Sequence, residues 1–164
     1  QDNGSGNVSL TPSAFQLVNE VEPATIFISY SRKQSSAFAL LIHTWLNKEG
    51  YTPFLDKELN AGVQWREDLR KRIQGCDFLV AVFGKETFPS TNIDDELTWA
   101  YEKDVRIIPI WHEGYDFQTA RPHLPDELFA VLDELNAVRI LEENPLQYEA
   151  AILALINRFS VTPE

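Results

Sequence analysis

The sequence predicts an α/β fold in which helices cover both faces of a five-stranded parallel sheet. Short runs of β-branched and aromatic residues alternate along the chain with segments whose apolar residues recur at helical spacing. The third run, residues 77–83, is apolar throughout, as expected of a central parallel strand that is buried on both faces. Such an alternation is typical of right-handed βαβ units and therefore of a three-layer sandwich.

The first half of the chain predicts two strands, each followed by a helix. The strand residues are mostly β-branched, aromatic or small, and the first strand follows the turn-forming Pro23. The first helix is stopped by Gly50 and has one apolar stripe, made by Phe38, Leu41, Ile42, Trp45 and Leu46. The second helix is marked by the four-residue spacing of Trp65, Leu69 and Ile73. The expected order is strand 25–30, polar loop 31–36, helix 35–50, strand 51–55 and polar loop 57–64.

The second half continues the pattern. The third helix begins near Ser90 to Asn92, any of which can cap it. The fourth and final helices have apolar stripes, made by Leu124, Leu128, Val131, Leu132 and Leu135 and by Tyr148, Ile152, Leu155, Ile156 and Phe159. The remaining elements are strands 77–83 and 106–111, a long loop 112–125 and a short strand 137–140. Right-handed crossovers then favour the strand order 2-1-3-4-5 of a flavodoxin-like doubly wound sheet.

Composition restricts the class of protein. The chain has 164 residues, which favours one domain, and its net charge of -11 argues against contact with nucleic acid. Its single cysteine excludes internal disulfides and favours a reducing, cytoplasmic setting. No apolar run approaches the roughly 18 residues that a membrane span needs. We expect residues 1–23 to be a linker or tail with one helical turn, cut from a longer protein, residues 24–160 to be the domain, and residues 161–164 to be a tail.

The carboxyl ends of the first and third strands are the expected place of the functional site. In a doubly wound sheet, ligands bind where the strand order reverses, and that point lies between these two strands. Tyr30, Ser31 and Arg32 would face residues 83–85 across a crevice, and the loop from Asp56 to Gln64 would cover it.

One acidic residue of the third helix is placed at the edge of this crevice. Glu96 lies about 40° from Ala100 on the helical wheel, on the flank of the buried stripe that Ala100 shares with Ile93, Leu97 and Tyr101. Partial burial raises the pKa of such a carboxyl group, whereas the nearby helix N-terminus lowers it. Glu96 is the one acid that the pattern alone brings to the crevice.

Four segments of the chain, in this order, are similar to the motifs of one family. They are Phe27-Ile28-Ser29-Tyr30-Ser31-Arg32-Lys33; Leu55-Asp56 followed by Gly62 and Trp65; Ser90 with Glu96-Leu97 and Ala100; and Ile107-Ile108-Pro109-Ile110. From about Thr25 to Phe159 the chain thus resembles Toll/interleukin-receptor homology (TIR) domains, and the prokaryotic type more than the animal receptor type. The third segment resembles the bacterial-type pattern S-x-W-x-x-x-E-L-x-x-A.

The resemblance implies two kinds of activity. Many TIR domains assemble through TIR–TIR contacts, and many others cleave NAD+ at the nicotinamide–ribose bond and form ADP-ribose or a cyclic variant. It implies that Glu96 is the catalytic residue, that NAD+ is a substrate and that no further cofactor is needed. The implied partners are other TIR domains, in a homo-oligomer formed on activation in defence or stress signalling. The substrate-binding residues would be Tyr30, Ser31, Arg32, Asp56, Trp65 and Trp99.

A single carboxylate is chemically sufficient for this reaction. Glycosidases need a second acid because their leaving oxygen must be protonated. The nicotinamide of NAD+ is cationic and departs neutral, so no general acid is required. What remains is to stabilise an oxocarbenium-like transition state, and a fixed carboxylate in a water-poor cleft can do this.

Each of these residues also has a purely structural interpretation. From pattern alone, Glu96 could be a solvated acid in a first helical turn, Arg32 a surface loop residue and Asp56 a turn cap. Trp65 could anchor the core, and Trp99, on the exposed side beside Glu96, could be a pocket wall or an oligomer contact. The three histidines have no ligand spacing, so we expect no metal site.

Two positions and one loop depart from the pattern of catalytic TIR domains. Asn92 stands where these domains usually carry a tryptophan, and Gln34 stands where an acid commonly follows the first motif. The loop of residues 56–62 also has an unusual length. The alternative is therefore a non-catalytic TIR–TIR interaction module. A phosphorelay receiver domain needs an aspartate at the end of the third strand, where this chain has Val82-Phe83-Gly84, so we set it aside.

Overall fold

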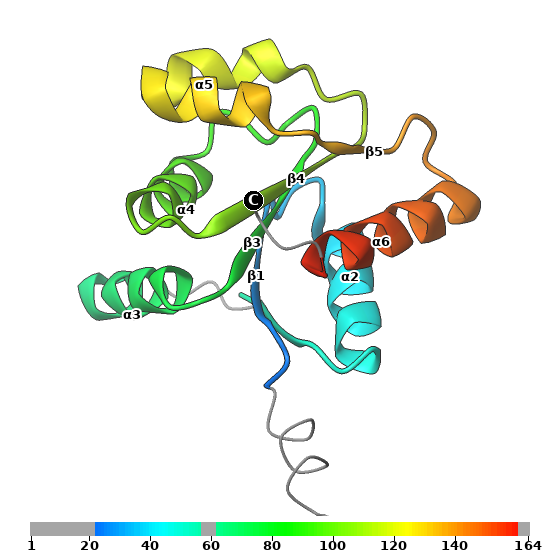
Figure 1. Ribbon diagram of the computed structural model, residues 1–164. Coiled ribbons are helices and arrows are strands. Elements are labelled where there is room, and N and C mark those ends of the chain that lie inside the picture. The colour runs from blue at the N-terminus through cyan, green and yellow to red at the C-terminus, as the bar shows by residue number, and fades with distance from the viewer. Residues whose placement is uncertain (1–21, 57–61, 161–164) are drawn as a thin grey trace, which may run out of the picture.

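A parallel sheet organises the chain, of which the computed structural model describes residues 22–56 and 62–160. Its strands are β1 (Thr25–Tyr30), β2 (Thr52–Leu55), β3 (Phe78–Phe83), β4 (Arg106–Trp111) and β5 (Val138–Arg139). They lie in the order β2-β1-β3-β4-β5, and each pair of neighbours is parallel (Figure 1). The predicted α/β fold and its flavodoxin-like strand order are confirmed.

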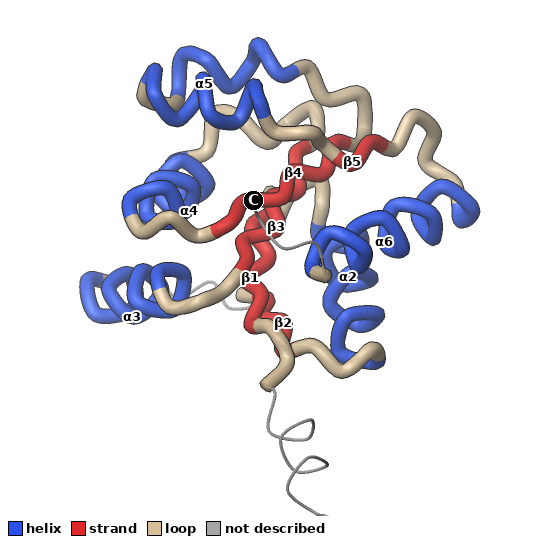
Figure 2. The backbone as a smooth tube through the Cα atoms, in the orientation of Figure 1, coloured by secondary structure: helices blue, strands red, loops and turns tan. Residues whose placement is uncertain are grey.

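Helices cover both faces of this sheet. They are α2 (Ser36–Lys48), α3 (Val63–Gln74), α4 (Thr91–Glu102), α5 (Asp126–Glu134) and α6 (Pro145–Phe159), with a 3-10 helix, η1 (Phe117–His123). Helices α2 and α6 lie on one side of the sheet, and α3, α4 and α5 lie on the other (Figure 2). The helical turn expected within the N-terminal tail, most of the polar loop after β2 and the C-terminal tail fall outside the described residues.

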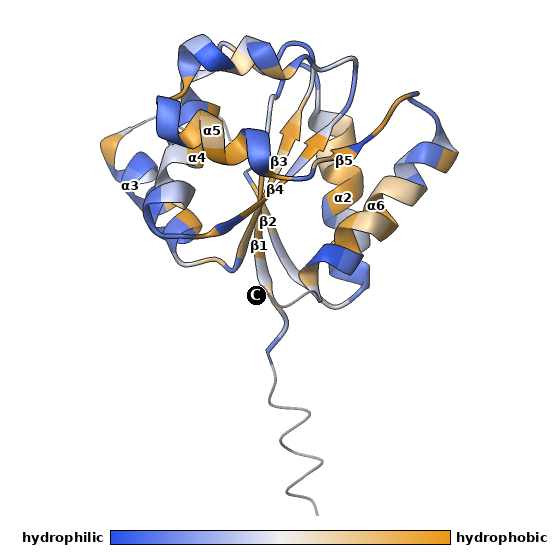
Figure 3. Cartoon of the chain, turned by 45° about the horizontal axis from the view of Figure 1, so that its top comes forward, coloured by the Kyte–Doolittle hydropathy of each residue, from blue (hydrophilic) through white to orange (hydrophobic). Residues whose placement is uncertain are grey.

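The core has two halves because alternate strand residues point to opposite faces. All six residues of β3 are buried, as predicted for a central parallel strand. Phe78, Val80 and Val82 pack toward α2 and α6, whereas Leu79, Ala81 and Phe83 pack toward α3, α4 and α5. In Figure 3 the apolar strands β3 and β4 lie between the helix layers. Among the helices of the described residues, none has the length and apolar character needed to span a membrane.

The long loop expected over residues 112–125 is partly wrong, because η1 lies within it. Its N-cap residue Asp116 accepts a hydrogen bond from the Gln118 backbone N–H at 3.0 Å. Phe117 is buried between Trp111 and Phe129, with ring centroids 5.7 and 4.5 Å away. A single short helix without a repeated apolar stripe gives too little periodicity to be recognised from sequence.

Candidate active site

A cleft of about 940 Å³ opens at the carboxyl ends of β1 and β2, between the loop after β1 and helices α3 and α4. Its position agrees with the rule that ligands bind where the strand order of a doubly wound sheet reverses. All seven residues predicted for the site line it, namely Tyr30, Ser31, Arg32, Asp56, Trp65, Glu96 and Trp99. The fold therefore brings together residues that are up to 69 positions apart in the sequence.

Helix α4 carries Glu96 into this cleft. The helix begins as predicted, since the Ser90 side chain accepts a hydrogen bond from the Ile93 N–H and caps the first turn. Ile93, Leu97 and Ala100 are buried against the sheet. Glu96, on the flank of this stripe, is only 8% exposed, so the interpretation as a solvated surface acid does not fit its position.

Ser29 holds the Glu96 carboxylate from the sheet. Residues of β1 alternate between the two faces, so Ser29 points with Phe27 toward the α4 side. Its hydroxyl donates a hydrogen bond to Glu96 Oε1 at 3.1 Å, and both side chains are buried. Ser29 was not among the predicted site residues. A small polar residue inside an otherwise apolar strand was the signal that could have identified it.

The environment of Glu96 favours its neutral form. Burial raises the pKa of this carboxyl group to about 8, with a smaller contribution in the same direction from Asp56. The hydrogen bond from Ser29 and the positive charge of Arg32 act against this shift. A strongly perturbed carboxyl group in a cleft is a candidate for chemistry, because structural acids are mostly exposed and ionised.

Tyr30, Arg32 and Asp56 form one hydrogen-bonded group at the end of β2. The Arg32 guanidinium contacts Asp56 Oδ2 at 2.8 Å, and the Tyr30 hydroxyl donates to the Asp56 backbone carbonyl at 2.8 Å. Side chains from the last residue of β1 and from the loop after it thus fix the residue at which the chain leaves β2. Arg32 is more than a free surface residue, and Asp56 is held by partners outside its own turn.

The two tryptophans lie on different walls of the cleft. Trp65 is half-buried near the start of α3 and belongs to neither half of the core, so the core-anchor interpretation does not apply. Trp99 is only 8% exposed, and its expected position on the exposed side of α4 is wrong. Helix α3 covers it, because the Arg66 guanidinium lies 5.1 Å from the Trp99 ring centroid and forms an ion pair with Asp95.

Gln34, which the sequence singled out only as a departure, connects two of the loops that carry cleft residues. Its side-chain oxygen accepts a hydrogen bond from the Glu86 backbone N–H at 2.7 Å and so joins the loops after β1 and β3. A Cβ atom at Gly84 would lie 2.3 Å from that oxygen, so a larger residue there would displace the Gln34 side chain. Asn92, the other departure, is exposed at the cleft.

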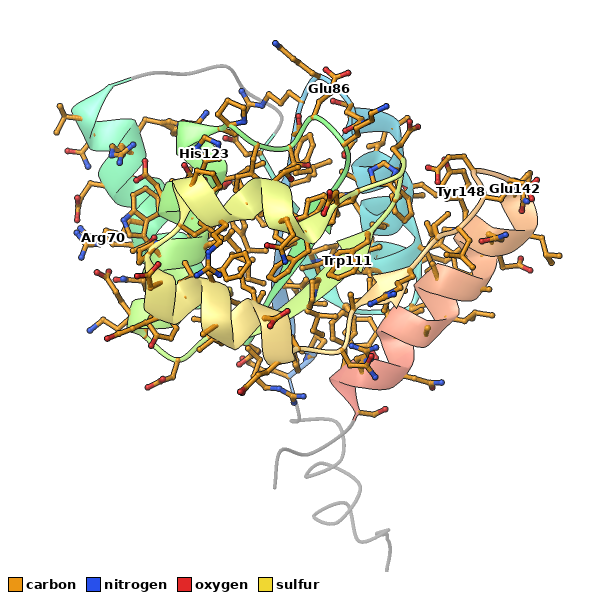
Figure 4. The ribbon with its side chains drawn as sticks, turned by 90° about the horizontal axis from the view of Figure 1, so that it is seen from above. Arg70, Glu86, Trp111, His123, Glu142 and Tyr148 are labelled. Carbon is orange, nitrogen blue, oxygen red and sulfur yellow. The ribbon has the colours of Figure 1, made fainter. Side chains whose placement is uncertain are left out.

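A second buried polar group lies behind the first loop. His112 Nε2 pairs with the Ser35 hydroxyl at 2.8 Å, and His112 Nδ1 pairs with Glu143 at 2.9 Å. Tyr148, on α6 and on the other side of the molecule from Arg70 in Figure 4, also donates to Glu143. His112, Glu113 and Glu143 place potential metal-ligand atoms within 4.8 Å of one another. Because both ring nitrogens of His112 already have protein partners, this group is explained as a structural brace of the loop.

Comparisons with known proteins agree with this architecture. The profile of the TIR domain family matches residues 26–153. A protein from Caenorhabditis elegans named NAD(+) hydrolase tir-1 is 27% identical over 142 residues, which cover 82% of this chain but only 14% of that protein. The chain therefore spans about one seventh of the length of this curated relative.

Solved structures support the fold. The TIR domains of the activated Roq1 resistosome superpose with a TM-score of 0.66 at 18% identity, covering 83% of this chain and 99% of theirs. The Clostridium botulinum CMP N-glycosidase BcmB superposes with a TM-score of 0.59 at 14% identity, covering 82% of this chain and 98% of that one. The family profile matches most of the chain, and the strand order and the cleft agree with that match. The chain therefore belongs to the TIR domain family.

Proposed function

We propose that this chain is a NAD+ hydrolase that cleaves the nicotinamide–ribose bond, with Glu96 as its catalytic carboxylate. The observation that carries the proposal is the Glu96 carboxyl group, which is buried beside a large cleft and hydrogen-bonded to Ser29. The name of the similar Caenorhabditis elegans protein, NAD(+) hydrolase tir-1, supports the same activity.

The cleft residues match what the reaction requires. When the glycosidic C–N bond breaks, its electron pair leaves with nicotinamide, which becomes neutral, and positive charge develops on the ribose. The Glu96 carboxylate would stabilise that charge. Water then adds to the ribose carbon and releases a proton, which gives ADP-ribose, or an internal nucleophile of the nucleotide adds and gives a cyclic product. No cofactor enters this scheme, in which NAD+ is the substrate.

The other predicted residues would bind and orient NAD+. Trp65 offers a half-exposed ring for stacking against a planar base. Arg32 and Tyr30 would orient the substrate indirectly, through their hydrogen bonds to Asp56 at the base of the loop that follows β2. Trp99 would form the wall beside Glu96.

Assembly forms part of the same proposal. The similar Roq1 structure is an activated resistosome that contains TIR domains, which supports self-association as the step that activates the domain. A cytoplasmic location and a role in defence or stress signalling complete the hypothesis.

Nicotinamide release measured over a range of protein concentrations tests the proposal. We expect activity that rises more steeply than the protein concentration and that Glu96→Gln abolishes. Glu149→Gln is the matched control, because Glu149 lies exposed on α6, away from the cleft. Equal activity of Glu96→Gln and wild type would contradict the assignment of Glu96.

The alternative is an interaction module without turnover. Asn92, at the position where catalytic TIR domains usually carry a tryptophan, favours this alternative. Self-association without nicotinamide release at any protein concentration would support it and would overturn the hydrolase proposal.

A further inference from the structure

We propose that Lys33 and Lys85 form a subsite that binds the pyrophosphate of the substrate. This inference rests on the proposed function, and it identifies which part of the substrate the two lysines recognise. Lys33 lies in the loop after β1, Lys85 lies in the loop after β3, and both line the cleft that contains Glu96. The sequence placed Lys85 at the predicted crevice and Lys33 in the first motif, but it assigned neither residue a role in binding.

The two loops that carry these lysines are held together. Their strands are neighbours in the sheet, with Tyr30 in register with Val82 at the carboxyl ends. Beyond the strands, the hydrogen bond from the Glu86 N–H to Gln34 Oε1 links the residue after Lys33 to the residue after Lys85. The close approach of Gln34 to Gly84 confirms that the loops are in contact. The two ammonium groups therefore extend from one tied pair of loops.

Of the described cations that line the cleft, the two lysines are the ones available for a ligand. Among the described residues, four basic ones line the cleft, and two of them, Arg32 and Arg66, are paired with Asp56 and Asp95. Within the part of the chain that the structure describes, Lys33 and Lys85 form no ion pair, and both are exposed. In a chain with a net charge of -11, two unpaired positive groups at one edge of a cleft favour an anionic ligand.

Among the described residues, three of the four acids that line the cleft are either paired or buried. Asp56 and Asp95 are neutralised by their arginine partners, and burial favours the neutral form of Glu96. The fourth of these described acids is Glu86, whose side chain is exposed and lies at the outer edge of the molecule in Figure 4. A pyrophosphate could thus contact both ammonium groups without displacing an existing ion pair.

The difference in burial between Glu96 and the two lysines agrees with the order of groups in a dinucleotide. Glu96 is buried, as the scissile nicotinamide–ribose bond requires, whereas the lysines are exposed at the mouth. In NAD+ the pyrophosphate follows that ribose directly, so it would lie outward of Glu96. The subsite would make the domain select pyrophosphate-bearing nucleotides over nicotinamide riboside, which contains the same scissile bond but no phosphate.

The double variant Lys33→Gln/Lys85→Gln tests this subsite. Its matched control is Lys48→Gln/Lys103→Gln, which makes the same charge change outside the cleft. Lys48 is the last residue of α2, Lys103 follows the last residue of α4, and both are exposed. We expect the KM for NAD+ to rise roughly tenfold in the first variant, with kcat little changed. The kinetics of nicotinamide riboside cleavage should stay as in wild type. Added salt should reproduce part of the effect in wild type, because exposed charges are screened.

Binding of inorganic pyrophosphate, followed by amide NMR shifts, gives a readout that does not depend on turnover. We expect wild type and the control to bind it and the Lys33→Gln/Lys85→Gln variant to bind it roughly tenfold more weakly. Equal pyrophosphate affinity of both double variants would overturn the subsite. If no protein releases nicotinamide but the affinities differ as expected, the hydrolase proposal fails and the anion subsite stands.

Discussion

The burial of Glu96 predicts how the proposed NAD+ cleavage depends on pH. Its pKa is raised from 4.5 to about 8 because burial disfavours the charged form, whereas stabilising an oxocarbenium-like transition state requires the charged form. The ionised fraction of such a group in the free enzyme is roughly 1% at pH 6 and roughly 10% at pH 7. We therefore expect kcat/KM to rise about tenfold per pH unit below pH 8 and to level off above it.

The assay is nicotinamide release at NAD+ concentrations well below KM, in buffers from pH 5.5 to 9.5 at constant ionic strength. Under saturating NAD+, the rise in kcat should shift to lower pH, because the cationic nicotinamide ring stabilises the ionised carboxylate. A kcat/KM that stays constant between pH 5.5 and 8.5 would refute the reasoning. Glu96 would then either keep an ordinary pKa or take no part in the reaction.

The same burial predicts how folding stability changes with pH. Between pH 4.5 and about 8 the folded protein holds a proton on Glu96 that the unfolded chain has lost, so the free energy of unfolding falls as the pH rises through this window. The loss from this residue is on the order of 5 kcal/mol at its upper limit. Glu96→Gln should raise the melting temperature clearly at pH 9 and much less at pH 5. An equal shift at both pH values would show that Glu96 titrates normally in the folded protein.

Three further substitutions test the packing around the cleft. Leu97→Ala should cost about 3 kcal/mol of unfolding free energy in urea denaturation, because Leu97 is fully buried on α4. His112→Ala should cost about 2 kcal/mol or more by the same measurement, because the buried Ser35 hydroxyl would lose its partner; a loss below about 0.5 kcal/mol would contradict a bracing role. Gly84→Ala should displace Gln34 and cost about 1 kcal/mol, and it should cost much less in a Gln34→Ala background, as a double-mutant cycle would show.

Much of the fold could be predicted because secondary structure depends on local patterns. The bounds of β1 and β4 agree with the predicted strands, since short β-branched runs flanked by polar residues leave little choice of register. The start of α4 was also predicted, because Ser90 is a strong N-cap residue ahead of a clear apolar stripe. The place of Glu96 on the flank of that stripe followed from the helical period, and its position at the crevice followed from that period together with the predicted strand order.

The tertiary structure decided how these elements contact one another. The Ser29–Glu96 hydrogen bond joins residues 67 positions apart, the Ser35–His112 bond spans 77 positions, and the Gln34–Glu86 bond spans 52. The burial of Trp99 likewise depends on Arg66, which belongs to another helix. A periodic pattern reports which face of an element is apolar, but it carries no information about which side chain of a distant element will reach that face. Sequence therefore determined the sheet, the helices and the candidate acid, whereas packing determined the partners, the depth of burial and hence the proton affinity of that acid.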